Sequence, residues 1–218
     1  ARMADTHAMV IRALFPTLIS QESLVSAGWR DFNQSLADEC RSLVASDAAG
    51  RRWSARNYLG GYTSYGSLDR LHLVSSLFDR LRRRIDPRVK AFARDLHYDL
   101  GGRALSMTDC WANVMPAGVV HSMHLHPTSF VSGTYYVAVP RGAGALKFED
   151  PRLPHHMAAP PRRSDAPQRF RSFVSVPARA CDLLLFESWL RHEVPPARFS
   201  GERISISFNY ALTEKHRR

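Results

Sequence analysis

Cysteine is scarce in this sequence, and the cysteines present are poorly spaced for disulfides. There are 3, at Cys40, Cys110 and Cys181, far apart and without a Cys-x-x-Cys arrangement. Small secreted domains that rely on disulfides carry even sets of cysteines at close spacings. The sequence therefore argues against a disulfide framework, and we expect a reducing, cytoplasmic environment.

Long apolar runs are also absent. No segment approaches the roughly eighteen uninterrupted apolar residues of a transmembrane helix. Residues 1–9 lack the apolar stretch of a signal peptide. We therefore expect no membrane association.

Acidic residues are in the minority. Lys and Arg total 30 against 20 Asp and Glu, which gives a formal net charge of +10. Such an excess suits nucleic acid, an anionic membrane surface or acidic small molecules as partners. The basic residues are nevertheless dispersed, and only Arg82, Arg83 and Arg84 form a tight cluster. A solvated basic surface is the better interpretation, so nucleic-acid binding is not expected.

The first hundred residues show helical spacing. Apolar residues recur every three or four positions, which is typical of amphipathic helices. We expect residues 11–100 to form a helical N-terminal support region. Within it, the sequence predicts an edge strand near residues 11–16, because Pro16 cannot donate a hydrogen bond to a neighbouring strand. Helices are expected to begin at Gln21, Ser67 and Asp86-Pro87, and Gly50 is expected to end the first of them. An ordered loop is expected over 51–65.

After Gly101-Gly102 the apolar period changes from 3.6 to 2, which indicates strands. We predict one domain over residues 1–218, of the α+β class and mainly β, with an antiparallel sandwich or barrel over 101–218 and the helices packed on one outer face. An irregular loop, with the composition of a lid or a disordered segment, is expected over 151–169. The expected strands cover 104–115, 119–125, 130–139, 145–148, 170–176, 182–186 and 202–212.

Histidines supply the most specific chemical signal. His124 and His126 are two residues apart, so on a strand both rings leave the same face, where one metal ion could contact both. His192 follows an apolar strand and could supply a third ligand, as a first-row metal requires. His121 lies three residues before His124 and is expected on the opposite face, either at the rim or as a residue that supports the ligands. Imidazole suits zinc, copper, iron and nickel alike, so the ligands alone do not choose the metal.

An arginine opens the last expected strand. Arg203 and Ser205 share one face of that strand, and a guanidinium suits a carboxylate. The order of these motifs resembles the iron(II)- and 2-oxoglutarate-dependent dioxygenases, specifically the prolyl-hydroxylase-like branch with its small uncharacterised bacterial members. The resemblance covers roughly the C-terminal half and is carried by the stretches 124–127, 132–137, 144–152, 185–194 and 203–209.

The resemblance implies a fold, cofactors and site residues. The fold would be a double-stranded β-helix of the jelly-roll or cupin-like kind. The cofactors would be Fe(II), held by His124, His126 and His192, and 2-oxoglutarate, which is decarboxylated to succinate while a substrate is hydroxylated. Arg203 and Ser205 would bind the distal carboxylate of 2-oxoglutarate, with Tyr136 as a further cosubstrate-binding residue.

Strand parity also assigns faces to Tyr135, Tyr136 and Asn113. Tyr135 and Tyr136 leave opposite faces, so Tyr136 faces inward with the histidines and Tyr135 packs in the core. Asn113 shares a face with Trp111 and either lines the pocket or satisfies buried backbone groups.

The sequence departs from the family at one position. Most members pair two histidines with a carboxylate, but His126 stands where that carboxylate is expected. An acid elsewhere could complete the site, and Asp109 and Glu187 are the nearest to plausible strands. Asp150 is instead expected in a turn before Pro151.

Other functions stay open at this stage. A cupin-like oxygenase with three histidines would not use 2-oxoglutarate, and Gly118 followed by His124-x-His126 fits the opening of the cupin motif. A β-barrel that binds a ligand without catalysis is another possibility. The sequence leaves open whether the substrate is a small molecule or a peptidyl group, and it does not indicate an oligomeric state.

Overall fold

Two antiparallel β-sheets make up most of the molecule. The computed structural model describes residues 10–212. The larger sheet has the order β1-β8-β5-β10-β3-β2, and the smaller one the order β4-β9-β6-β7. The larger sheet comprises β1 (Ile19–Ser23), β2 (Tyr62–Thr63), β3 (Leu105–Pro116), β5 (Val131–Ala138), β8 (Asp182–Glu187) and β10 (Glu202–Leu212); the smaller comprises β4 (His121–His124), β6 (Leu146–Glu149), β7 (Phe173–Val176) and β9 (His192–Val194).

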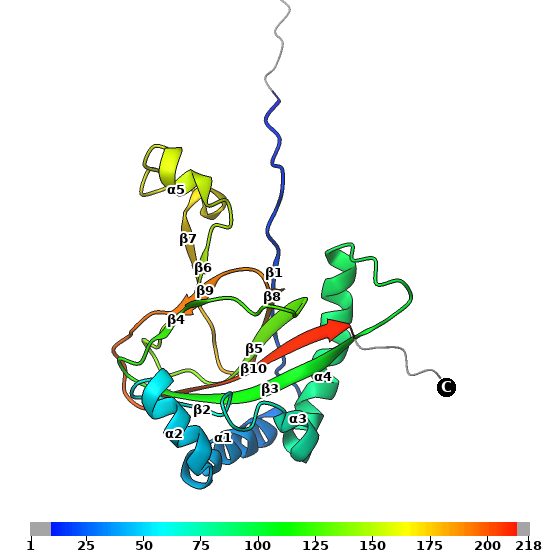
Figure 1. The fold of residues 1–218 in the computed structure, drawn as a ribbon, viewed down its shortest axis with the longest axis vertical. Helices are drawn as coiled ribbons and strands as arrows, with labels where there is room; N and C mark the ends of the chain where they lie inside the picture. The colour runs from blue at the N-terminus through cyan, green and yellow to red at the C-terminus, as the bar shows by residue number, and fades with distance from the viewer. Residues whose placement is uncertain (1–9, 213–218) are drawn as a thin grey trace, which may run out of the picture.

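Helices cover one side of the larger sheet, and the smaller sheet lies on its other side (Figure 1). The expected mainly β architecture is thereby confirmed. In the described part of the chain, no helix combines the length and apolar character needed to cross a bilayer. The helices are α1 (Trp29–Ser46), α2 (Ala48–Asn57), α3 (Leu71–Val74), α4 (Ser76–Asp95) and α5 (Pro154–Ala158), with the 3₁₀ turn η1 (Gln168–Phe170).

Alternation along β5 divides the core into two layers. Tyr135 packs in the layer between the larger sheet and the helices, where its hydroxyl accepts a hydrogen bond from Trp29 Nε1 (2.8 Å) and donates one to Asn33 Oδ1 (2.7 Å). Tyr136 lies in the layer between the two sheets, with Phe148 and Phe186. Because successive residues of a strand face opposite sides, Tyr135 is bonded to α1 and Tyr136 lies between the two sheets.

The start of the first helix differs from the prediction. The segment from Ile19 to Ser23 is an edge strand paired with β8, and α1 begins only at Trp29, after Gly28 with a positive φ of 70°. Val25, which extended the helical pattern toward Gln21, is 68% exposed. The expected edge strand near residues 11–16 is absent, because pairing starts at Ile19. An apolar period cannot reveal a strand whose partner lies 160 residues downstream.

The other helix boundaries also shifted. Gly50 does not close the first helix; its N–H donates to Asp47 Oδ1 (2.8 Å), so Asp47 caps a separate helix, α2, inside the expected loop. The second helical segment begins at Leu71 rather than Ser67, and Ser75 caps the longer α4. Local hydrogen-bonding side chains set these boundaries.

Pro87 does not separate two helices as predicted, because α4 continues through it. A proline inside a helix costs about 3 kcal/mol. Against this, burial of a large apolar side chain contributes about 1.5–3 kcal/mol. The buried face of α4 runs on both sides of the proline and comprises Phe78, Leu81, Ile85, Val89 and Phe92. The free energy gained by burying this apolar face therefore exceeds the cost of the proline inside the helix.

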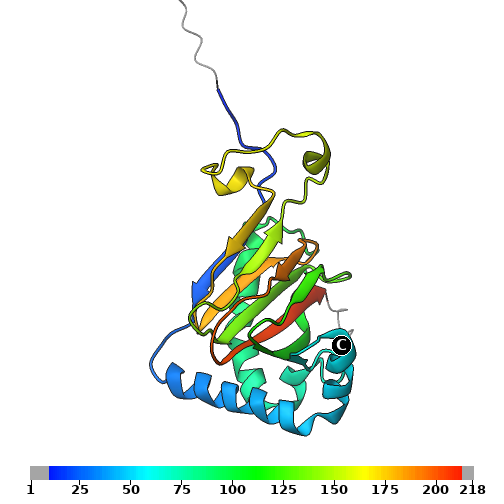
Figure 2. The same ribbon diagram turned by 90° about the vertical axis from the view of Figure 1, so that its left-hand side faces the viewer.

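The segment expected to be irregular contains short elements. Helix α5 and the η1 turn lie within 151–170, at the far end of the β6–β7 hairpin. In Figures 1 and 2 this end projects away from the sheets. All seven predicted strands are present with ends shifted by a few residues, whereas the short strands β2 and β9 were not anticipated.

Candidate functional site

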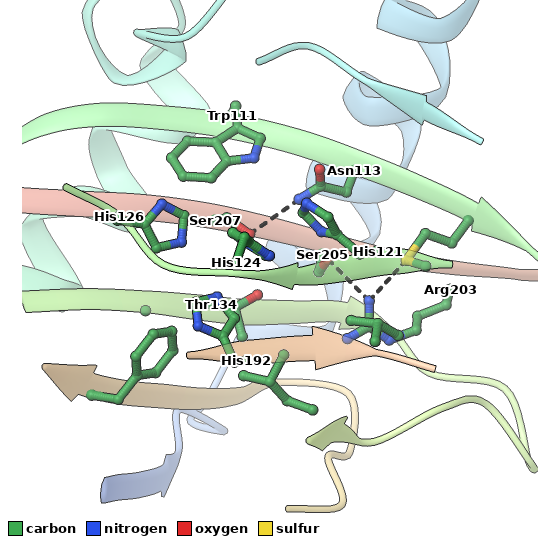
Figure 3. A pocket seen from close by; sticks show the side chains of 15 residues that line it. Trp111, Asn113, His121, His124, His126, Thr134, His192, Arg203, Ser205 and Ser207 are labelled. Carbon is green, nitrogen blue, oxygen red and sulfur yellow. Dashed lines mark hydrogen bonds between the residues drawn. The ribbon is translucent and has the colours of Figure 1, made fainter. Parts of the chain in front are cut away.

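Three imidazoles converge at the open edge of the smaller sheet. His124 ends β4 and His192 begins β9, and the two residues are paired directly across the strands. His126 lies two residues beyond β4, where its backbone N–H donates to the carbonyl of Ser188 (2.9 Å). One potential ligand atom from each ring lies within 4.8 Å of the others. The structure thus brings together the three histidines that the sequence singled out, in a group that could hold a metal ion (Figure 3).

Backbone carbonyls fix the orientation of two of these rings. The Nδ1 atoms of His124 and His192 lie 2.7 Å and 2.9 Å from the carbonyl oxygens of Ser122 and Leu190. A carbonyl only accepts, so each Nδ1 carries the proton and each Nε2 keeps its lone pair in the neutral ring. Hydrogen bonds of this kind commonly orient metal-binding histidines.

Burial keeps the rings neutral. Loss of solvent lowers the pKa of His192 to about 2 and that of His126 to about 4, with further lowering by the neighbouring imidazoles. Burial also lowers the pKa of His124, and the hydrogen bond to Ser122 opposes that shift. A metal ligand must be unprotonated, so near neutral pH the three nitrogens are available to a cation.

No carboxylate joins the three histidines among the described residues. Of the two acids considered from the sequence, Asp109 accepts a hydrogen bond from Thr108 Oγ1 (2.7 Å), and Glu187 accepts one from Tyr98 (2.9 Å). Asp150 accepts from the backbone N–H of Arg152 (3.0 Å), in the expected turn. Among the described residues, the group that could hold a metal ion therefore consists of imidazoles alone.

Arg203 lines the same pocket at the start of β10, apart from the imidazole cluster (Figure 3). Its side chain is buried at 3% exposure, and among the described residues it makes no ion pair. Its Nη1 donates weakly to Ser205 Oγ (3.4 Å) and Met115 Sδ (3.3 Å), and Nε has no partner. A buried cation without a carboxylate is costly unless a ligand supplies the negative charge.

The other two predicted residues lie close to Arg203. The Arg203 guanidinium is 5.1 Å from the ring centre of Tyr136, a cation–π contact, and the Tyr136 hydroxyl is buried without a partner. Burial raises the pKa of Tyr136, so the phenol stays protonated and able to donate. Asn113 lines the pocket; its Nδ2 donates to Ser207 Oγ (3.1 Å), and its Oδ1 has no partner. Tyr136 and Asn113 thus each contribute a buried polar atom without a partner to this region.

His121 does not point away from the site as predicted. A register irregularity between His121 and His124 breaks the alternation of β4, and the two rings stack with centroids 4.3 Å apart. His121 therefore lines the pocket, although it is outside the group of three potential ligands. Tyr58, from the connector after α2, was not identified from the sequence either; its ring packs edge-on to His121 at 5.2 Å.

Part of the chain matches the sequence model of a known protein family. Residues 109–209 match the model of the family Putative 2OG-Fe(II) oxygenase. No curated protein sequence matches the chain.

Solved structures share the fold at low sequence identity. A prolyl-4-hydroxylase from Pseudomonas putida is 20% identical with a TM-score of 0.60, over 91% of this chain and 94% of that one. HygX from Streptomyces hygroscopicus, solved with nickel, 2-oxoglutarate and hygromycin B, is 16% identical with a TM-score of 0.58, over 90% and 84%. A prolyl hydroxylase from Trichoplax adhaerens, bound to a hypoxia inducible factor peptide, is 19% identical with a TM-score of 0.52, over 88% and 83%. The family match over residues 109–209 supports the superfamily that the motifs resembled, and the solved structures show a shared fold.

Proposed function

We propose that this member of the iron(II)- and 2-oxoglutarate-dependent oxygenases is a hydroxylase whose iron is held by His124, His126 and His192. The observation that carries the proposal is the pairing of a three-imidazole cluster with a buried, unpaired Arg203 in one pocket. The first feature suits a first-row metal, and the second suits an anionic cosubstrate.

The donor set fits Fe(II) chemically. Neutral imidazoles suit iron as well as zinc, copper and nickel. Three of them leave the metal at charge +2, which the 2-oxoglutarate dianion would balance. When bound, Fe(II) and 2-oxoglutarate would supply the oxidising chemistry with O2 as the oxidant: one oxygen atom would enter succinate as 2-oxoglutarate loses CO2, and the other would hydroxylate a substrate C–H bond. A site without a carboxylate should retain iron less tightly than the common two-histidine, one-carboxylate set.

The residues around Arg203 would bind and orient the cosubstrate. The guanidinium would hold the distal carboxylate of 2-oxoglutarate by charge-assisted hydrogen bonds, with Ser205 as a lesser donor. Tyr136 would add a phenolic donor, and Asn113 would offer its amide at the pocket wall. The apolar walls from Phe186 and its neighbours would keep water from the reacting groups.

We propose further that the two facing sheets form a double-stranded β-helix, as the strand order and the shared fold suggest. The substrate would be a small molecule or a peptidyl group. One solved relative binds hygromycin B and another binds a peptide, so both kinds of ligand occur on this fold. Fold alone does not select between them.

An uncoupled turnover assay tests this proposal without knowledge of the substrate. Protein loaded anaerobically with Fe(II) and given 2-oxoglutarate should release succinate when oxygen is admitted, at a slow but measurable rate. The matched controls are the same protein with Zn(II) and the variant His192→Ala. Succinate formation that is independent of iron, or absent with a fully loaded site, would overturn the proposal.

The all-imidazole ligand set also favours a second candidate, a cupin-like oxygenase that oxidises its substrate without 2-oxoglutarate. Iron-dependent oxygen consumption with a thiol substrate, unchanged by 2-oxoglutarate and by Arg203→Met, would favour it. Metal analysis distinguishes both enzymes from a non-catalytic binding barrel, which would contain no metal.

A further inference from the structure

Tyr58 has the features of a ligand-binding residue that lies outside the family match at 109–209. It follows α2, in the N-terminal half of the chain, and its side chain is 4% exposed. Its hydroxyl is buried and has no hydrogen-bond partner. Buried hydroxyl groups are nearly always satisfied, so an unpaired one requires an explanation.

The backbone holds the Tyr58 ring in position. The Tyr58 N–H donates to the Ser54 carbonyl (2.8 Å) at the end of α2. The chain then turns at Gly60, with φ of +80°, and a Cβ on Gly61 would lie only 2.7 Å from Tyr58 Cε1. Glycine at this second position is what lets the ring pack against the connector. The phenol is thus directed by the fold and does not swing freely.

Tyr58 lies next to the pocket that contains the buried arginine, because its ring packs against His121, and His121 lines that pocket together with Arg203. Burial raises the pKa of Tyr58, and the positive charge of Arg203 opposes that rise. Tyr58 and Tyr136 belong to the same buried cluster between the sheets, and both hydroxyls lack partners, as does Arg203 Nε. The Tyr136 ring lies against the guanidinium, and burial raises the pKa of both phenols, so both keep their protons. Hydrogen-bond donors gathered around an unpaired guanidinium call for an anion with several acceptor lone pairs, which a carboxylate provides.

We propose that Tyr58 donates a hydrogen bond to the distal carboxylate of 2-oxoglutarate, beside Arg203. This inference rests on the proposed function and extends it to a residue of the N-terminal region. The helical segment then does more than support the sheet, because its connector completes the cosubstrate site. Tyr58 becomes a specificity-determining residue that favours 2-oxo acids with a second carboxylate over those that lack one.

Calorimetric titration of the anaerobic Fe(II)-loaded protein tests this directly. The two ligands are 2-oxoglutarate and 2-oxovalerate, which has a methyl group in place of the distal carboxylate. The variants are Tyr58→Phe and a matched control, Tyr62→Phe, which removes a hydroxyl four residues further along, at the start of β2. The Tyr62 hydroxyl donates to Asp47 (3.0 Å) instead of facing the pocket.

We expect Tyr58→Phe to weaken 2-oxoglutarate binding about tenfold or more, as for the loss of a hydrogen bond to a charged group. Binding of 2-oxovalerate and the iron content should not change, and Tyr62→Phe should bind both ligands like the wild type. The melting temperature of the ligand-free Tyr58→Phe protein should stay equal or rise, because the lost hydroxyl had no partner.

Two results would overturn the inference. Wild-type affinity for 2-oxoglutarate in Tyr58→Phe would show that the phenol makes no contact with it, and equal weakening for both ligands would show a general structural effect. Failure of the wild type to bind 2-oxoglutarate at all would instead overturn the proposed function, and the inference with it. The wild-type titration therefore separates the two failures.

Discussion

Replacing Arg203 by methionine should stabilise the ligand-free protein while it destroys cosubstrate binding. The side chain is 3% exposed and pairs with no carboxylate of the described chain. An uncompensated buried charge costs several kcal/mol. A methionine of similar length removes that charge and keeps most of the packing.

The interactions lost with the arginine offset part of this gain. The cation–π contact with Tyr136, at 5.1 Å, contributes up to about 2 kcal/mol when desolvated. The long hydrogen bonds to Ser205 and Met115 contribute about 1 kcal/mol or less each. We therefore expect a net gain of order 1 kcal/mol for the variant, or about 2–4 °C in melting temperature for a chain of this size.

Cosubstrate binding should change in the opposite direction. Removing one partner of a buried, hydrogen-bonded charge pair costs about 2–5 kcal/mol, which weakens binding from about 30-fold to several thousand-fold. A ligand at 100 times its dissociation constant stabilises the wild type by about 2.7 kcal/mol. The same concentration of 2-oxoglutarate should leave the Arg203→Met variant almost unchanged.

Scanning calorimetry of the Zn(II)-loaded protein, with and without 2-oxoglutarate, measures both effects without turnover. Arg88→Met is the matched control, because Arg88 forms a surface ion pair with Glu22 (2.9 Å) and should change neither quantity much. The reasoning is refuted if ligand-free Arg203→Met melts several degrees below the wild type. It is equally refuted if 2-oxoglutarate stabilises this variant as much as the wild type.

Three further changes test separate parts of the structure. His192→Ala should lower metal affinity by more than about 100-fold in a chelator competition, since it removes one of three ligands, and unchanged affinity would contradict the site. Gly133→Ala should cost about 1–3 kcal/mol in urea unfolding, because a Cβ there would lie 2.5 Å from Phe208 Cζ and 2.6 Å from the Leu184 carbonyl; an unchanged midpoint would contradict this packing. Burial lowers the pKa of His72 below 6.5, so the unfolded state takes up a proton that the folded state does not, and stability falls as the pH drops below about 6.5. Between pH 7.5 and 5.5 the metal-free His72→Gln variant should lose less melting temperature than the wild type, and equal losses would show that His72 is not responsible.

Strand positions were the most predictable part of the fold. The alternation in β3, β5 and β10 is local, and it gave their ends to within about two residues. The wrong helix boundaries arose where contacts with residues distant in the sequence determine where a helix begins or ends. Ile19 pairs with Phe186, and the face of α4 is buried across Pro87 by sheet residues far along the chain.

The candidate site was predictable in its members but not in its geometry. Motif order singled out the three histidines, Arg203 and Asn113, and all of them line one pocket. The opposite-face prediction for His121 was wrong, because the register irregularity in β4 is set by pairing with β9. Tyr58 gave no signal, since nothing near it in the sequence indicates that its ring packs against His121.

The sequence by itself determined which chemistry the chain carries: imidazoles at strand spacing, an arginine opening the last strand, and apolar periods that separate helices from sheet. Only the tertiary structure decided that His192 lies across from His124, that no acid completes the ligand set among the described residues, and that Arg203 is buried without a counterion. The physical reason is that periodicity is a property of neighbours along the chain. Convergence, burial and charge compensation depend on strands brought together from far apart.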